Sequence, residues 1–294
     1  MRQARCKRIF RAIQAAMAGM LVLASLIPAP VRAGGPITWL ESCGLGQRTQ
    51  DYLVRDILLI AQAYRKLFSY RFGADFHMDI RFFCTPASFE GFLEQHLPEA
   101  AASEVVGLFL PEYHLMLISA RGTDDPAATL LHETSHALLD SHSGHYRIWL
   151  HEGLAETFEY IDRQSPSLKL KPNAYAMHGL QLMYSQRPAM LDLKRYLSLD
   201  LEAWRQLDRN FPLADTAINF SRSMAWGLAS FLLESPQGRK LLNKIMENAR
   251  QRSPQSDLDV IAKNWPGGIK GLQNEWLRWL QRPAHVLDFP QIKL

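Results

Sequence analysis

One short stretch of the chain, His132-Glu133-Thr134-Ser135-His136, has the residue types and the spacing of a metal site. On a helix, residues four apart lie one turn apart on the same face, so the two imidazoles can converge on one metal ion. Zinc is the expected metal, because it binds imidazoles and carboxylates and, in catalytic sites, keeps three protein ligands and one position for water. Glu133 then stands beside that water and can take its proton. The alternative is a pair of surface histidines on an ordinary helix.

A carboxylate suited to be the third ligand is Glu152, sixteen residues after His136. It belongs to an aromatic-led amphipathic segment, Trp149–Glu156, which we expect to form a second helix. Glu152 would complete a ligand set of two histidines and one glutamate. Glu156 lies one turn further along the same face, where a carboxylate can accept the N–H of a ligating imidazole and fix its orientation. A solvated surface charge is the alternative for Glu156.

This pair of motifs resembles the gluzincin group of zinc metallopeptidases, the peptidase MA-like families, in which the H-E-x-x-H helix is followed by a helix carrying W-L-x-E-G-x-A. The resemblance covers residues 132–156. It implies a zincin-like fold and the hydrolysis of a peptide or protein substrate. It also implies that His132, His136 and Glu152 are zinc ligands, that Glu133 is the general base, and that Glu156 is an acid beside the ligands.

A different third ligand is offered by His142. It follows His136 at the spacing of the metzincin signature H-E-x-x-H-x-x-G-x-x-H. The glycine position of that signature is Leu139 here, and a leucine side chain resists the sharp turn that glycine permits. The sequence therefore favours Glu152 over His142 and leaves both arrangements open.

The chain departs from the gluzincin pattern at Phe220. Peptide hydrolysis needs a hydrogen-bond donor that stabilises the oxyanion. By the resemblance, this donor is expected to be a tyrosine at the start of a helix that begins near residue 220. Phenylalanine has no hydroxyl, so another side chain must replace it, or turnover is weak; the candidates are Tyr175, His178, Tyr184 and Arg222. The departure keeps open a second class of function, a metal-binding or peptide-binding protein on the same fold that cleaves little or nothing.

The segments before the motif predict a small sheet with accompanying helices. They are a helix over 48–70, a strand over 78–84, a short helix over 88–96, and a hairpin of strands over 105–110 and 114–119. Asp124-Asp125-Pro126 then marks the start of the metal helix, since an acidic cap and a first-turn proline favour a helix N-terminus.

The chain after Tyr160 is expected to be helical. Apolar residues recur at helical spacing over 179–186, 188–197, 220–234, 236–251 and 269–281. We therefore expect an α+β fold with a small mixed sheet and the metal helix in residues 34–160 and a helical part in residues 161–294. Together these would form a single zincin-like unit over 34–294.

The first 33 residues have the layout of a secretory signal peptide: a basic start, an apolar run over 12–27, and small residues in Val31-Arg32-Ala33 before a cleavage site. We expect the mature chain to be periplasmic or secreted, without stable membrane insertion; an uncleaved membrane anchor is the alternative. The signal carries six of the 33 Lys and Arg residues, which leaves 27 against 29 Asp and Glu and a formal net charge of −2. This balance argues against nucleic-acid binding.

Two cysteines, Cys43 and Cys84, remain in the mature chain. In an exported protein an even pair predicts one disulfide, which would stabilise the fold by about 4 kcal/mol in the chain-entropy model. Two separate buried thiols are the alternative.

Overall fold

The structure is a computed structural model that describes residues 36–70, 77–98, 105–120, 125–143, 147–209 and 219–293. The signal peptide expected over 1–33 lies outside these residues. The chain divides into two compact units. We call the first, Met1–Val54 with Gly73–Glu133, the sheet unit, and the second, Arg55–Phe72 with Thr134–Leu294, the helical unit.

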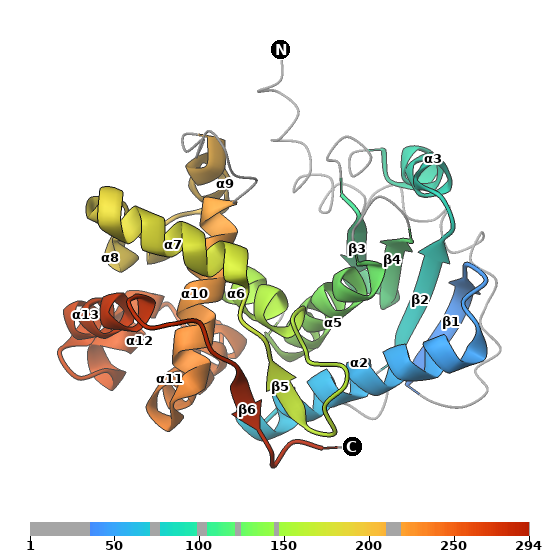
Figure 1. Cartoon of the computed structure of the whole chain (residues 1–294). Helices are drawn as coiled ribbons and strands as arrows, with labels where there is room; N and C mark the ends of the chain where they lie inside the picture. The colour runs from blue at the N-terminus through green and yellow to red at the C-terminus, as the bar shows by residue number, and fades with distance from the viewer. Residues whose placement is uncertain are drawn as a thin grey trace. The chain divides into compact units, whose positions relative to one another are not determined.

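The described residues of the sheet unit form a four-stranded sheet in the order β1-β2-β4-β3 (Figure 1). They are β1 (Ile37–Ser42), β2 (Met78–Phe83), β3 (Gly107–Leu110) and β4 (Leu115–Ser119). β1, β2 and β4 are parallel, and β3 is antiparallel to β4. All side chains of β4 and all but Arg81 of β2 are buried, as is usual for central parallel strands.

The local elements around this sheet form as the sequence predicts. The hairpin turn is a 3-10 turn, η2 (Pro111–Tyr113), and the helix α3 (Pro86–His96) begins with a capping box between Thr85 and Ser88. α3 packs on an apolar cluster that it shares with the sheet and that contains Phe83, Phe89, Leu93, Leu110, Leu115 and Leu117.

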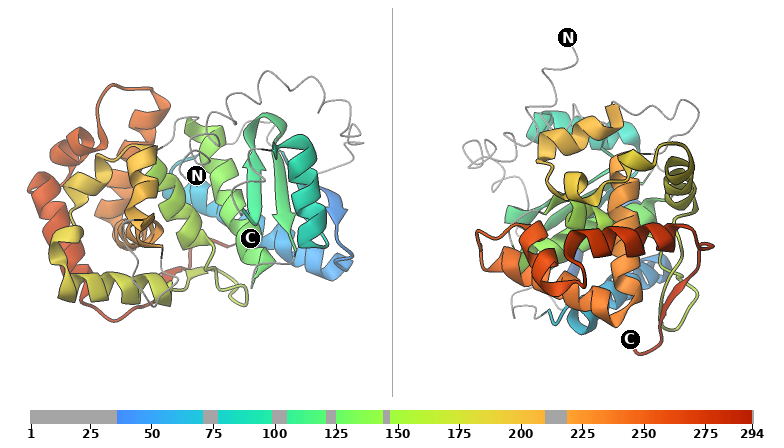
Figure 2. Two further views of the ribbon diagram at one scale, coloured as in Figure 1. Left: turned by 90° about the horizontal axis from the view of Figure 1, so that it is seen from above. Right: turned by 90° about the vertical axis from the view of Figure 1, so that its left-hand side faces the viewer.

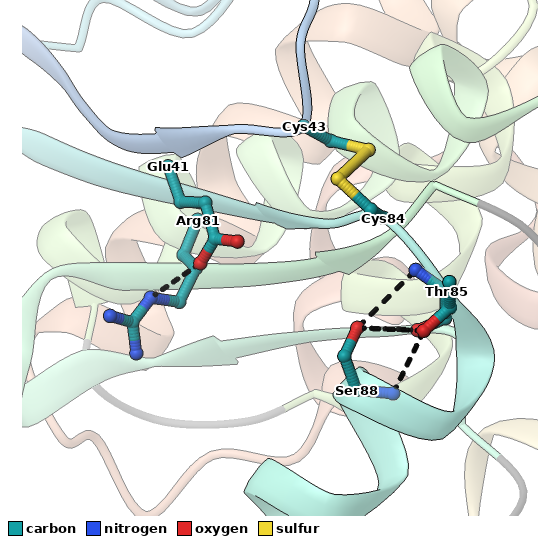
Figure 3. Close-up of a disulfide and its surroundings, with 6 residues drawn as sticks. All are labelled: Glu41, Cys43, Arg81, Cys84, Thr85 and Ser88. Carbon is teal, nitrogen blue, oxygen red and sulfur yellow. Dashed lines mark hydrogen bonds and ion pairs between the residues drawn. A yellow bond between two sulfur atoms is a disulfide. The ribbon is translucent and has the colours of Figure 1, made fainter.

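A disulfide joins Cys43, just after β1, to Cys84, just after β2 (Figure 3). The predicted pairing is therefore confirmed. The bridge closes a segment with a sequence separation of 41 residues, for which the chain-entropy model gives a stabilisation of about 4 kcal/mol. In the same pair of strands, Arg81 lies 3.4 Å from Glu41, its neighbour in the sheet register.

Two long helices each contribute residues to both units. These are α2 (Gln47–Leu67), which overlaps the helix predicted over 48–70 but ends three residues earlier, and α5 (Pro126–Ser143), which carries the H-E-x-x-H motif. Each is one unbroken helix. The N-terminus of α5 is capped by Asp125, whose carboxylate accepts hydrogen bonds from the backbone N–H groups of Ala127 (3.0 Å) and Ala128 (3.2 Å).

The helical unit is organised around α10 (Phe220–Glu234), which contacts α6, α7, α9, α11 and α13 (Figures 1 and 2). The other elements are α6 (Ile148–Phe158), α7 (Ala174–Gln186), α8 (Leu193–Leu197), α9 (Leu201–Arg209), α11 (Pro236–Arg250), α12 (Asp257–Asn264), α13 (Gly268–Leu280), the turn η3 (Pro188–Met190) and the antiparallel pair β5 (Leu168–Leu170) and β6 (Leu287–Phe289).

The fold class is thus α+β, with a small mixed sheet in the N-terminal half and a helical C-terminal half, as predicted. Within the described ranges, no helix combines the length and the apolar character needed to cross a membrane. The disulfide between Cys43 and Cys84 is compatible with export.

Candidate metal centre

Helix α5 presents the residues of the H-E-x-x-H motif. His132 and Glu133 are buried, at 7% and 8% exposure, and the side chain of His136 is 19% exposed. The two units divide between Glu133 and Thr134, but α5 is continuous there, so His132 and His136 are fixed one turn apart.

The opposite side of the motif is anchored in the interior of the helical unit. Thr134 and Ser135 are fully buried, and the Ser135 hydroxyl is 2.6 Å from the hydroxyl of Tyr64 on α2. Burial raises the pKa of Tyr64 well above its usual range, so its hydroxyl stays protonated and available for this bond. The anchored face fixes the rotation of α5 and therefore the direction of His136.

Helix α6 presents Glu152 and Glu156. Its first turn is held by Trp149, whose indole Nε1–H donates to Asp257 Oδ2 at 2.7 Å. Arg147 adds an ion pair to the other oxygen of Asp257 at 2.9 Å. On the next turn Gly153 lies against α10, where a Cβ atom would be 2.5 Å from the carbonyl oxygen of Ala225. The glycine of the W-L-x-E-G motif therefore permits the close packing of α6 on α10.

Substituting Gly153 by alanine is expected to destabilise the protein by about 1–3 kcal/mol, because the added methyl group meets backbone atoms of α10 that cannot move away locally. Urea unfolding of the purified protein measures this change. Gly91→Ala is the matched control, since a Cβ atom on Gly91 in α3 meets nothing within 4 Å. A Gly153→Ala variant as stable as the wild type would contradict the packing argument.

Three side chains converge as a possible ligand set. The nearest ligand atoms of His132, His136 and Glu152 all lie within 4.8 Å of one another, and His136 Nε2 is 3.9 Å from Glu152 Oε1. In a tetrahedral zinc site with bonds near 2.1 Å, neighbouring ligand atoms are about 3.4 Å apart. Small side-chain adjustments would close the group around an ion, so these residues fit a metal site.

Further carboxylates surround this group. Ligand atoms of His132, Glu156 and Glu159 also lie within 4.8 Å of one another, so the carboxylate of Glu156 lies near the imidazole of His132. Burial, followed by the negative charges of Glu159 and Glu156, raises the pKa of Tyr160 to about 12. Glu159 was not predicted, although the spacing of residues 152, 156 and 159 by four and three is typical of one helix face.

Arg222 on α10 also contacts two of these carboxylates, those of Glu152 and Glu156. Arg222 Nε is 3.4 Å from Glu152 Oε2, and Arg222 Nη1 is 3.2 Å from Glu156 Oε1. The sequence indicated Arg222 only as one of four possible oxyanion donors. Its ion pairs with two glutamates of α6 follow from the packing of α6 on α10.

The other three donor candidates lie in different surroundings. Tyr184 accepts a hydrogen bond from Gln281 at 3.1 Å, and His178 is exposed. Tyr175 is 79% exposed and interacts electrostatically with Tyr160. Phe220 itself is buried, at 2% exposure. Of the four candidates, Arg222 is the one with direct contacts to Glu152 and Glu156.

Next to the group, His151 is buried at 3% exposure and its ring stacks on that of His136, with ring centroids 5.8 Å apart. Burial lowers the pKa of His151 to about 4. A neutral ring stacked on His136 supports its orientation, which agrees with a structural role.

His142 has different neighbours from the other two histidines of α5. Its ring centroid is 4.7 Å from that of Tyr70, and it interacts electrostatically with Arg250 and Glu247 of α11. Among the described residues, one of the two groups of converging ligand atoms includes Glu152, and neither includes His142.

The stability of the protein is expected to depend on pH through His142. Burial, reinforced by the positive charge of Arg250, lowers the pKa of this imidazole in the folded state. Below the unfolded-state pKa of about 6.5, His142 binds a proton more readily in the unfolded chain than in the folded protein. This contribution to the unfolding free energy is therefore complete above a pH of about 6.5 and is lost as the pH falls through the folded-state pKa.

Urea unfolding in a chelator from pH 8 to pH 5, for wild type and His142→Gln, measures this effect. As the pH decreases, the unfolding free energy of the wild type should fall relative to that of His142→Gln. A difference that is independent of pH would contradict the assignment.

Known proteins were compared with the chain at the level of family and of sequence. No protein-family model matches it, and no curated protein was found to be similar to it.

Proposed function

We propose that this chain is an exported zinc metallopeptidase of the gluzincin type. The observation that carries the proposal is the convergence of His132, His136 and Glu152 within 4.8 Å, with Glu133 next to the first histidine on the same helix. Two imidazoles and one carboxylate are the ligand set of thermolysin-type catalytic zinc sites. The nearby acid Glu156 suits a role in orienting His132.

Each residue of the site would have its own role in peptide hydrolysis. Zinc held by His132, His136 and Glu152 would supply a Lewis acid and lower the pKa of a water molecule. A carboxylate oxygen of Glu133 takes the proton of the attacking water and passes it to the nitrogen of the leaving amine. The low exposure of Glu133, 8%, suits this role because burial limits exchange of its proton with bulk water.

An extended peptide is the substrate that the sheet unit favours. β3 is one of the two edge strands of the sheet, and its Gly107 lies so close to α5 that a Cβ atom there would be 3.1 Å from Glu133 Oε1. A peptide that adds to the edge of a sheet is held by main-chain hydrogen bonds. Pairing with β3 would therefore bring a substrate backbone near the proposed general base.

Export is part of the proposal. It is supported by the signal-like sequence over 1–33 and by the disulfide between Cys43 and Cys84, since structural disulfides persist in oxidising compartments.

The test is hydrolysis of a mixed peptide library by the purified mature protein, with products identified by mass spectrometry. We expect cleavage that stops in a chelator and returns when zinc is added. Zinc binding without any cleavage would contradict the peptidase and favour the alternative suggested by Phe220, a metal-binding or peptide-binding protein. A protein that binds no zinc would overturn the metal centre as well.

A further inference from the structure

Arg222 lies in the first turn of α10. All fifteen residues of this helix are described, and Arg222 is the only one that is exposed. Its side chain keeps 44% exposure. The helix start is fixed by Asn219, whose side chain accepts a hydrogen bond from the Arg222 N–H at 3.0 Å. The guanidinium therefore projects from a rigid helix at a defined place.

The two oxygens of Glu152 have different neighbours. Oε1 lies 3.9 Å from Nε2 of His136, and Oε2 lies 3.4 Å from Nε of Arg222. One oxygen thus faces the proposed ligand group and the other faces a cation. A carboxylate can bind a metal ion through one oxygen or through both, so a guanidinium beside one oxygen favours binding through the other.

The same guanidinium also contacts Glu156, at 3.2 Å from Nη1 to Oε1. Because Nε and Nη1 belong to one planar group, the two carboxylates of α6 are held in a fixed relation. The positive charge also offsets part of the repulsion between these two acids.

We propose that Arg222 is a positioning residue that commits Glu152 to binding the metal through a single oxygen and holds Glu156 in place beside it. The proposal rests on the metal centre of the proposed function and is independent of peptide cleavage. Its functional consequence would be that a bound metal keeps three protein ligands and one water, because a second oxygen of Glu152 would add a fifth ligand. A lysine could not hold both carboxylates in the same way, since its ammonium group is a point charge without the planar fork.

The test compares three variants with the wild type. Arg222→Met keeps an unbranched side chain and removes every donor, and Arg222→Lys keeps the positive charge. Arg282→Met is the matched control, because Arg282 is another half-exposed arginine of the helical unit that pairs with a glutamate, Glu234, at 3.3 Å. Circular dichroism and thermal unfolding establish that each variant is folded.

The first readout is zinc affinity, measured by competition with a coloured chelator. We expect Arg222→Met to bind zinc about 10–100-fold more weakly, as is typical when an outer-shell partner of a ligand is removed. Arg222→Lys should recover part of this loss, and Arg282→Met should match the wild type. Unchanged affinity in a folded Arg222→Met protein would overturn the proposal.

The second readout is the visible absorption of the cobalt-substituted protein, which reports coordination number. Four-coordinate cobalt absorbs more strongly than five-coordinate cobalt, so Arg222→Met should show a weaker band if Glu152 turns both oxygens to the metal. An identical spectrum in the wild type and in Arg222→Met would contradict the role of Arg222. A wild type that binds neither zinc nor cobalt would instead overturn the metal centre itself, so the two failures are distinguishable.

Discussion

Replacing Glu133 by glutamine is expected to lower kcat/KM for peptide hydrolysis by about 100- to 10,000-fold, the usual contribution of a general base. Glutamine has nearly the same size and shape, so the packing of this side chain near Gly107 is preserved. Its amide cannot accept the proton of the attacking water. Glu133 is outside the group of converging ligands, and zinc content should therefore stay at the wild-type level.

The measurement is steady-state hydrolysis of the best peptide from the library, with zinc per protein determined on the same samples. Glu202→Gln on α9 is a control for the chemical change alone, since Glu202 pairs with Gln206. If Glu133→Gln keeps wild-type activity, Glu133 is not the base and the mechanism is wrong.

Replacing Glu152 by alanine is expected to weaken zinc binding by more than about 100-fold, beyond the 10–100-fold effect that is typical of outer-shell partners. The substitution removes one of the three converging ligand atoms. Peptide hydrolysis should disappear at ordinary zinc concentrations. Competition with a chelator measures the affinity.

His142→Ala is the comparison that separates the two possible ligand sets. The ring of His142 contacts Tyr70 and lies near Arg250, so this variant should bind zinc as the wild type does. Loss of zinc in His142→Ala together with retention in Glu152→Ala would show that the metzincin arrangement is correct instead.

The parts of the fold that the sequence predicted well have strong local signals. α10 begins and ends at the residues predicted, 220 and 234, because Asn219 caps its start and Ser235 with Pro236 starts the next helix. Asp125 likewise fixes the start of α5. The pairing of Cys43 with Cys84 could be predicted because the third cysteine, Cys6, lies in the segment with the layout of a signal peptide.

The elements that sequence reasoning missed depend on distant partners or have weak patterns. β1 (Ile37–Ser42) pairs with β2, and its residues are mostly half-buried, so no clear alternation marks it. β5 and β6 are three residues each and lie more than a hundred residues apart in the chain. α12 (Asp257–Asn264) is only eight residues long.

In the candidate site, too, some contacts could be predicted from the sequence and others could not. The approach of His132 to His136 could be predicted because their spacing on one helix is a local property, and that of Glu152 because its segment resembles the second gluzincin motif. The contact of Arg222 with Glu152 and Glu156 could not be predicted, because it joins residues about seventy positions apart and depends on how closely Gly153 lets α6 approach α10. The buried Phe220 marks this helix start as different from the gluzincin pattern, but only the packing identifies which side chain reaches the glutamates.

The most direct test of the metal centre is anomalous diffraction at the zinc absorption edge from crystals of the mature protein grown with zinc. We predict one peak about 2 Å from an imidazole nitrogen of His132, an imidazole nitrogen of His136 and one carboxylate oxygen of Glu152. A peak beside His142, or no peak near Glu152, would contradict this ligand set.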